Sequence, residues 1–183
     1  MANLCFNKVF LIGDNDKLQK IVDAYNSIHT KYKTLETIQE ILQLDCSDWG
    51  RSYDDGVSLV EIIKDRTLVI ECTTAWSSVD AYWDALKEHL GLDTWASYSE
   101  LDSEVWVTND PDKIYFPDEY LLDVYDSSPY DFDDDRYFFK SQKDFVAFMN
   151  GKTKENHKFK YYENLINEDS EWGILVTIER CNA

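Results

Sequence analysis

The order of the apolar patterns between residues 4 and 109 constrains the fold more than any other feature of this sequence. In chain order, the patterns first indicate a strand at 4–12, then a helix that begins near Asp14 or Asp16 and has its apolar face at 18–28, and then a short helical insertion at 35–44. A strand pair at 57–64 and 67–74 follows, then a helix at 79–90 and strands at 95–101 and 104–109. Strand–helix–strand therefore occurs twice in succession, which is typical of a ferredoxin-like antiparallel sheet with its helices on one face. We expect an α+β fold.

Turn signals separate these elements. Residues 45–56 are rich in turn-forming residues, so we expect a long surface loop there. Ser77 and Ser78 are expected to cap the second helix, and Gly91 is expected to end it.

The patterns become weaker after Pro111. They indicate strands at 120–125 and 136–139, a helix from Ser141 to Asn150-Gly151, a helix near 159–166 and a final strand at 172–180. We assign residues 1–110 to a ferredoxin-like domain and residues 111–183 to a smaller C-terminal α/β lobe packed on it. The alternative is that the C-terminal part extends the first sheet.

Charge is abundant and unevenly distributed. The chain has 36 acidic and 18 basic residues, for a formal net charge of −18. Residues 93–135 contain fourteen acidic residues and one basic residue, whereas residues 136–160 contain seven basic and two acidic residues. An acidic field of this size repels nucleic acid and anionic membranes. One interpretation is a solvated acidic face that keeps the protein soluble, and the other is a surface that attracts a basic surface of another protein. The densest run of carboxylates consists of Asp131, Asp133, Asp134 and Asp135.

The sequence contains no motif for catalysis or cofactor binding. His29, His89 and His157 stand apart from one another, and none has a cysteine or second histidine at zinc-ligand spacing. The run that starts at Asp131 opens like a calcium-binding loop, but Arg136 stands where that loop requires glycine. We therefore expect no enzymatic activity, no cofactor and no dedicated metal site.

The cysteines and the N-terminal residues bear on the compartment. Cys5, Cys46, Cys72 and Cys181 are far apart, so we expect free thiols, and at Cys72 a buried thiol instead of a nucleophile. The opening residues lack the basic region and apolar core of a signal peptide. No apolar run reaches the length of a membrane span. These features predict a cytoplasmic protein.

Four segments carry a family resemblance: N-L-C-x-N at 3–7, D-W-G-R-S-Y at 48–53, T-T-A-W-S at 73–77 and S-Y-S-E at 97–100. Together they resemble the YubB-type ferredoxin-like family, small proteins of phages, plasmids and other bacterial mobile elements. That family typically has the motifs N-W-C-x-N, N-W-G-T-K-W, T-A-W-S-P-P and Y-x-E. In this chain, Leu4 replaces the tryptophan of the first motif, and Ser78 replaces a proline of the third. The resemblance covers residues 3 to about 109 and implies the fold and a mobile-element setting, but no activity.

The same segments contain aromatic and charged residues that the topology can gather at one end of the sheet: Trp49, Arg51, Tyr53, Trp76, Tyr98 and Glu100. One interpretation is an aromatic recognition patch with Arg51 and Glu100 as polar contacts. The other is structural, with Trp76 filling the core under the helix and Trp49 holding the long loop.

Two hypotheses for function follow. The first is a non-enzymatic interaction protein whose acidic, aromatic-bearing surface binds a basic surface of another protein, such as a host defence or DNA-binding protein that it would inhibit. The alternative is a single-stranded nucleic-acid-binding module that uses the sheet and the basic segment 136–160.

Overall fold

The computed structural model describes residues 4–29, 33–46, 52–63, 66–75, 79–100, 105–167 and 172–181. The chain divides into two units, Met1–Glu100 and Leu101–Ala183. The sequence predicted a boundary at residue 110, after the strand at 104–109. The division falls before that strand, so β5 (Val105–Thr108) lies in the second unit, where it pairs in parallel with β9 (Glu179–Arg180).

The first unit contains, in chain order, β1 (Leu4–Ile12), α1 (Asn15–Ser27), α2 (Leu35–Leu42), β2 (Ser52–Ile63), β3 (Thr67–Ala75), α3 (Asp80–Leu90) and β4 (Asp93–Glu100). Its strands lie in the order β2-β3-β1-β4, and the three neighbouring pairs are antiparallel. A helical connection joins β1 to β2 and another joins β3 to β4, which is the β-α-β-β-α-β arrangement of a ferredoxin-like sheet. The α+β fold class is confirmed.

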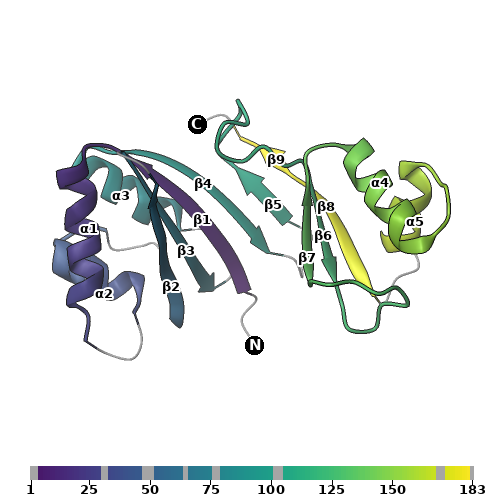
Figure 1. The fold of residues 1–183 in the computed structure, drawn as a ribbon. Helices are drawn as coiled ribbons and strands as arrows, with labels where there is room; N and C mark the ends of the chain where they lie inside the picture. Colours follow the sequence, from purple (N-terminus) through teal and green to yellow (C-terminus); the bar gives the residue numbers. More distant parts are fainter. Residues whose placement is uncertain are drawn as a thin grey trace. The chain divides into compact units, whose positions relative to one another are not determined.

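Alternation along the strands places one face of this sheet in the core. Val9 pairs with Ile70 and Leu11 with Leu68, and all four side chains are almost fully buried. They form one cluster with buried residues of α1, α2 and α3. The three helices lie on the same side of the sheet (Figure 1). The apolar face of the sheet therefore packs against the apolar faces of the amphipathic helices, as the sequence predicted.

Two turn predictions for the first unit need correction. Part of the expected loop at 45–56 is strand, since β2 begins at Ser52, opposite Thr74, with a register shift before Val57. The N-cap of α3 is Val79, which makes no side-chain capping bond, whereas Ser77 and Ser78 lie outside the described residues. Gly91 ends α3 in the left-handed region at φ 61°, as expected.

The second unit has its own sheet and core. It contains β5, β6 (Tyr120–Val124), β7 (Arg136–Phe139), α4 (Gln142–Thr153), α5 (Phe159–Asn167), β8 (Gly173–Thr177) and β9. β6 pairs antiparallel with β7 on one side and with β8 on the other. Buried residues of α4 and α5 pack with one face of this three-stranded sheet, and Trp106 of β5 packs with residues on its other face.

Two predictions in this unit also need correction. Ser141 caps α4 as expected, accepting a hydrogen bond from the Asp144 amide, but the helix continues through Asn150-Gly151 to Thr153. The final strand expected at 172–180 is two strands, interrupted at Ile178, whose amide donates to the Glu119 carbonyl. Among the described residues, no helix combines the length and apolar character needed to cross a membrane.

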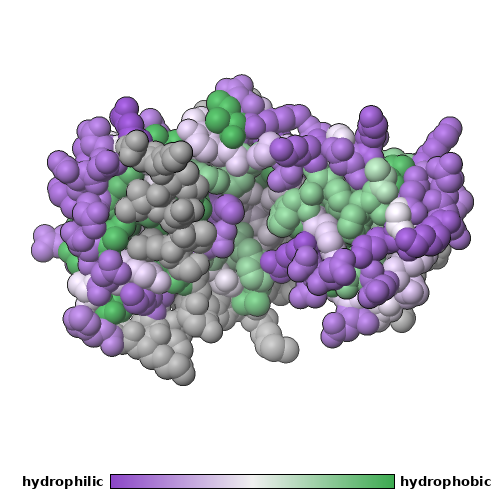
Figure 2. Space-filling view, viewed as in Figure 1, coloured by the Kyte–Doolittle hydropathy of each residue, from purple (hydrophilic) through white to green (hydrophobic). Residues whose placement is uncertain are grey.

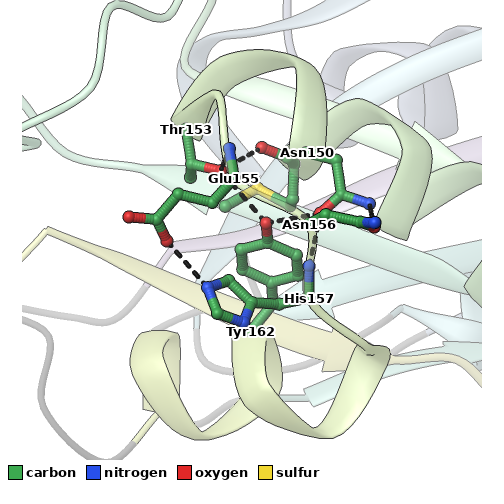
Figure 3. A network of polar contacts seen from close by, with 7 residues as sticks. Asn150, Thr153, Glu155, Asn156, His157 and Tyr162 are labelled. Atoms are coloured by element: carbon green, nitrogen blue, oxygen red, sulfur yellow. Dashed lines mark hydrogen bonds and ion pairs between the residues drawn. The ribbon is translucent and has the colours of Figure 1, made fainter.

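A buried tyrosine joins α4 to α5. The Tyr162 hydroxyl lies 2.6 Å from Asn150 Oδ1 and 3.0 Å from Thr153 Oγ1. Asn150 Oδ1 also accepts from the His157 amide, and the His157 ring contacts Glu155 at 2.9 Å (Figure 3). Because Tyr162 is fully buried, these bonds satisfy a hydroxyl that would otherwise be costly to bury. The network holds the connection between the two helices.

Two glycines of the second unit should respond oppositely to alanine. A Cβ at Gly173 would lie 2.7 Å from the Asp123 carbonyl oxygen on the neighbouring strand, whereas nothing lies within 4 Å of one at Gly151 in α4. Gly173→Ala should lower the free energy of unfolding by about 1–3 kcal/mol, and Gly151→Ala should raise it by about 0.5–1 kcal/mol. Urea denaturation of both variants checks the pair; equal stabilities would contradict the strand pairing at Gly173.

Candidate functional site

The most acidic surface of the second unit is the loop between β6 and β7. We call residues 125–135 the acidic loop; Asp126, Asp131, Asp133, Asp134 and Asp135 are all exposed in it. Figure 2 shows hydrophilic residues over much of the described surface on the face it draws. The carboxylates of the acidic loop therefore lie at the surface, where their negative charge acts on other molecules.

Aromatic side chains fix this loop to the core of the unit. The Phe132 ring stacks on Trp172, at 6.0 Å between ring centroids, and on Phe148 at the same separation. Tyr130 meets the Trp172 ring edge-on at 5.6 Å. These rings are partly buried against the core, so they support the loop instead of adding exposed contact area.

Backbone bonds hold the carboxylates in place. The Asp134 amide donates to the Tyr137 hydroxyl at 2.7 Å, and the Val124 amide donates to the Asp135 carbonyl at 2.7 Å. Lys152 Nζ lies 2.8 Å from the Asp131 carbonyl oxygen. An acidic segment that would repel itself is thereby kept in one conformation.

The four predicted aspartates separate into two pairs. Lys152 Nζ, which binds the Asp131 carbonyl, also lies 2.8 Å from Asp133 Oδ2. This hydrogen bond and the lysine charge lower the pKa of Asp133 below its ordinary value. Asp134 and Asp135 instead line a shallow hollow with Asp126.

The hollow is acidic on balance. It is lined by Asp123, Val124, Tyr125, Asp126, Ser127, Asp134, Asp135 and Arg136. Arg136 Nε donates to Asp123 Oδ1 at 2.9 Å, which neutralises Asp123. Among the described residues, no ion pair is formed by Asp126, Asp134 or Asp135. Three carboxylates thus face a concave surface, an arrangement suited to a cationic group.

One aspartate of the acidic stretch 93–135 has a structural role. Asp110 is almost fully buried, and Oδ2 accepts from the amides of Tyr115 and Phe116. Burial alone would raise its pKa, but these backbone bonds and the Arg180 charge outweigh it and lower the pKa below the ordinary value. Arg180 also donates to the carbonyls of Asp110, Phe116 and Asp118, so this side chain organises the segment before β6.

A second polar cluster lies on the helix-facing side of the first sheet. Asn7 pairs with Cys72 on one side and with Tyr98 on the other. Asn7 Nδ2 donates to Thr74 Oγ1 at 2.9 Å and to the Cys5 carbonyl at 3.1 Å. Three of the segments that carry the family resemblance therefore meet at one end of the sheet.

The side chains of this cluster have a structural role. Burial, reinforced by the nearby Cys5 and Glu36, raises the pKa of Cys72 far above its ordinary value. Because the thiolate is the reactive form, Cys72 is a poor nucleophile. Asn7 and Thr74 are buried and hydrogen-bonded to each other, as polar groups in a core must be. Asn7 belongs to one of the motifs in the sequence, but the motif gives no sign of its hydrogen bond to Thr74.

The remaining predicted site residues are only partly described. Trp49, Arg51 and Trp76 lie outside the described residues, and the side chains of Tyr53 and Glu100 do too, although their backbones lie in β2 and β4. Tyr98 is partly buried on the helix-facing side, next to Asn7. The choice between a recognition patch and a structural role for these aromatics stays open.

No family model, no curated protein and no solved structure matches this chain. In the part of the chain that the structure describes, no group of three or more histidine, cysteine or acidic side chains is arranged to hold a metal ion.

Removing Lys152 should change the titration of the acidic loop. In Lys152→Met, the pKa of Asp133 should rise toward its ordinary value, as measured by NMR titration of the carboxyl group. In the wild type, the stabilisation from this pair is present above the unfolded-state pKa of Asp133 and lost as pH falls through the lower folded-state value. That pH dependence should disappear in the variant. Lys154→Met is the matched control, because Lys154 contacts the Gly151 carbonyl; an Asp133 pKa that moves equally in both variants would contradict the assignment.

Proposed function

We propose that this protein is a non-enzymatic interaction module of a bacterial mobile element that acts in the cytoplasm by binding a basic surface of another protein through its acidic loop. The observation that carries the proposal is the fixed conformation of that loop. Phe132 stacks on Trp172, and Lys152 and Val124 bond the loop backbone. A preorganised set of charges loses less conformational entropy on binding than a flexible one, which favours affinity.

The hollow suggests how a basic partner is recognised. Asp126, Asp134 and Asp135 surround it, and a lysine or arginine side chain of the partner would place its charge among them. Long-range attraction by the acidic field would also speed encounter with a basic groove, including one that otherwise binds nucleic acid. This supports a role in competing with nucleic acid for a host defence or DNA-binding protein.

The charge layout favours a protein partner over nucleic acid. Of the basic residues in 136–160, Arg136 is bonded to Asp123, Lys152 to Asp133 and Lys160 to Glu163. Those charges are already compensated within the unit, so they contribute little to phosphate binding, which depends on neutralising the backbone with lysine and arginine. The mobile-element assignment rests on the resemblance of residues 3–109 to the YubB-type family.

Neutralising the acidic loop should abolish partner capture. The test variant replaces Asp131, Asp133, Asp134 and Asp135 with asparagine. The matched control makes the same change in net charge at exposed helix positions of the first unit: Asp23→Asn, Glu40→Gln, Asp84→Asn and Glu88→Gln. Pull-downs from nuclease-treated bacterial lysate should recover a partner with the wild type and the control but not with the test variant.

The captured complex should also be sensitive to salt. Its affinity should fall steeply as ionic strength rises from about 0.05 to 0.5 M, because screening shortens the reach of exposed charges. A partner retained equally by the control and the test variant would contradict the proposal. Recovery that depends on intact nucleic acid would instead favour the single-stranded nucleic-acid module.

A further inference from the structure

One dipeptide of α4 combines a reactive sequence with an accessible position. Asn150-Gly151 lies in the last turn of the helix, which ends at Thr153. Glycine has no side chain to hinder attack by its own backbone nitrogen, so asparagine is most prone to lose its side-chain amide when glycine follows it. Gly151 is exposed, and among the described residues no atom beyond its chain neighbours and its own helix backbone lies within 4 Å of a Cβ placed on it. Water therefore reaches this turn.

The reaction of such a dipeptide is an intramolecular ring closure followed by hydrolysis. The Gly151 nitrogen attacks Asn150 Cγ, so that an N–Cγ bond forms and the Cγ–Nδ2 bond breaks. The proton of the Gly151 amide leaves with Nδ2 as ammonia, and a succinimide ring remains. Water then opens one of the two carbon–nitrogen bonds of the ring. The product is either aspartate or isoaspartate, and the backbone of isoaspartate is longer by one methylene group.

Helical geometry prevents this ring closure. A residue in an α-helix has a ψ of about −42°, and the succinimide ring closes only after the asparagine rotates well away from that value. The Gly151 amide hydrogen is also bonded within the helix ladder. The last turn of α4 must therefore open before Asn150 reacts, and the reaction rate follows the population of the open turn.

Side-chain and backbone groups outside the turn hold it closed. The Tyr162 hydroxyl donates to Asn150 Oδ1 at 2.6 Å, and the His157 amide donates to the same oxygen at 2.9 Å (Figure 3). Lys154 Nζ donates to the Gly151 carbonyl at 2.7 Å. Rotation of Asn150 into the reacting conformation breaks its bonds to Tyr162 and His157, so these bonds oppose the opening of the turn.

We propose that Asn150 is a site of spontaneous deamidation and that the Tyr162 hydroxyl limits its rate by holding the last turn of α4 closed. Lys152 links this site to the acidic loop, because it lies in the same turn and its Nζ binds the Asp131 carbonyl and Asp133 Oδ2. An added backbone methylene at position 150 would displace Lys152 and release Asp133. The modification itself is independent of the proposed function, whereas its effect on partner binding rests on that function.

Peptide mass spectrometry of the full chain, incubated at neutral pH in water labelled with heavy oxygen, measures the conversion of Asn150. Each conversion replaces the amide nitrogen and places one labelled oxygen in the product. The folded wild type should convert slowly, and the chain unfolded in urea should convert much faster. Tyr162→Phe should convert about fivefold faster than the wild type, because loss of one hydrogen bond raises the population of the open turn.

Matched variants separate this effect from a general loss of stability. Tyr137→Phe removes a hydroxyl of the same unit that accepts from the Asp134 amide and lies outside the network, so it should convert like the wild type. Gly151→Ala should suppress conversion, since its Cβ hinders attack and alanine strengthens the helix. Thr153→Val removes the other hydroxyl that contacts Tyr162 and should accelerate conversion; it carries the test if Tyr162→Phe does not fold.

The products test the link to the acidic loop. Chains that contain isoaspartate should show the higher Asp133 pKa expected for Lys152→Met, as measured by NMR titration. Asn150→Asp keeps the normal backbone length and should leave the Asp133 pKa close to that of the wild type. An unchanged Asp133 pKa in the isoaspartate chains would contradict the link.

Two results would overturn the proposed site. The first is an Asn150 that keeps its amide in the folded wild type and in Tyr162→Phe over an incubation that converts the unfolded chain. The second is a Tyr162→Phe that converts no faster than Tyr137→Phe. Mass spectrometry reports the modification and the pull-down reports partner binding, so failure of this proposal is distinguishable from failure of the proposed function.

Discussion

The stacking of Phe132 on Trp172 and Phe148 determines the shape of the acidic surface. Phe132 is the apolar residue among closely spaced aspartates, whose mutual repulsion would favour an extended, variable loop. Its ring gains apolar burial that opposes this repulsion, and Lys152 adds bonds to the Asp131 carbonyl and the Asp133 carboxylate. The surface through which we propose the protein acts is therefore a product of the core of the second unit.

Charge compensation within the second unit decides where its acidic field is concentrated. Arg136, Lys152 and Lys160 each bind an acidic side chain of the same unit. Asp110, although it belongs to the acidic stretch 93–135, is buried and accepts hydrogen bonds from backbone amides of the segment before β6. The acidic residues that remain around the hollow are Asp126, Asp134 and Asp135. A chain with a net charge of −18 thus presents a localised acidic surface around the hollow.

Helix and strand predictions succeeded where the signal was local and repeated. The strand at 4–12 coincides with β1, and the amphipathic pattern at 18–28 overlaps α1, because apolar periodicity reports which face each element buries. The predicted end of α4 at Asn150-Gly151 was wrong. A glycine in a helix costs only about 1 kcal/mol, and the burial of Met149 and the bonds between Asn150, Thr153 and Tyr162 outweigh that local preference.

The sequence by itself determined the order of the helices and strands, the α+β class and the uneven distribution of charge, because each is a property of residues close together in the chain. Only the tertiary structure decided that Asn7 meets Thr74, that Phe132 stacks on Trp172 and that Lys152 compensates Asp133 while Asp134 and Asp135 line the hollow. It also decided that β6, β7 and β8 form a three-stranded sheet of their own. These contacts join residues far apart in the chain, so their energies appear only when the sheets and helices pack and bring the partners within reach.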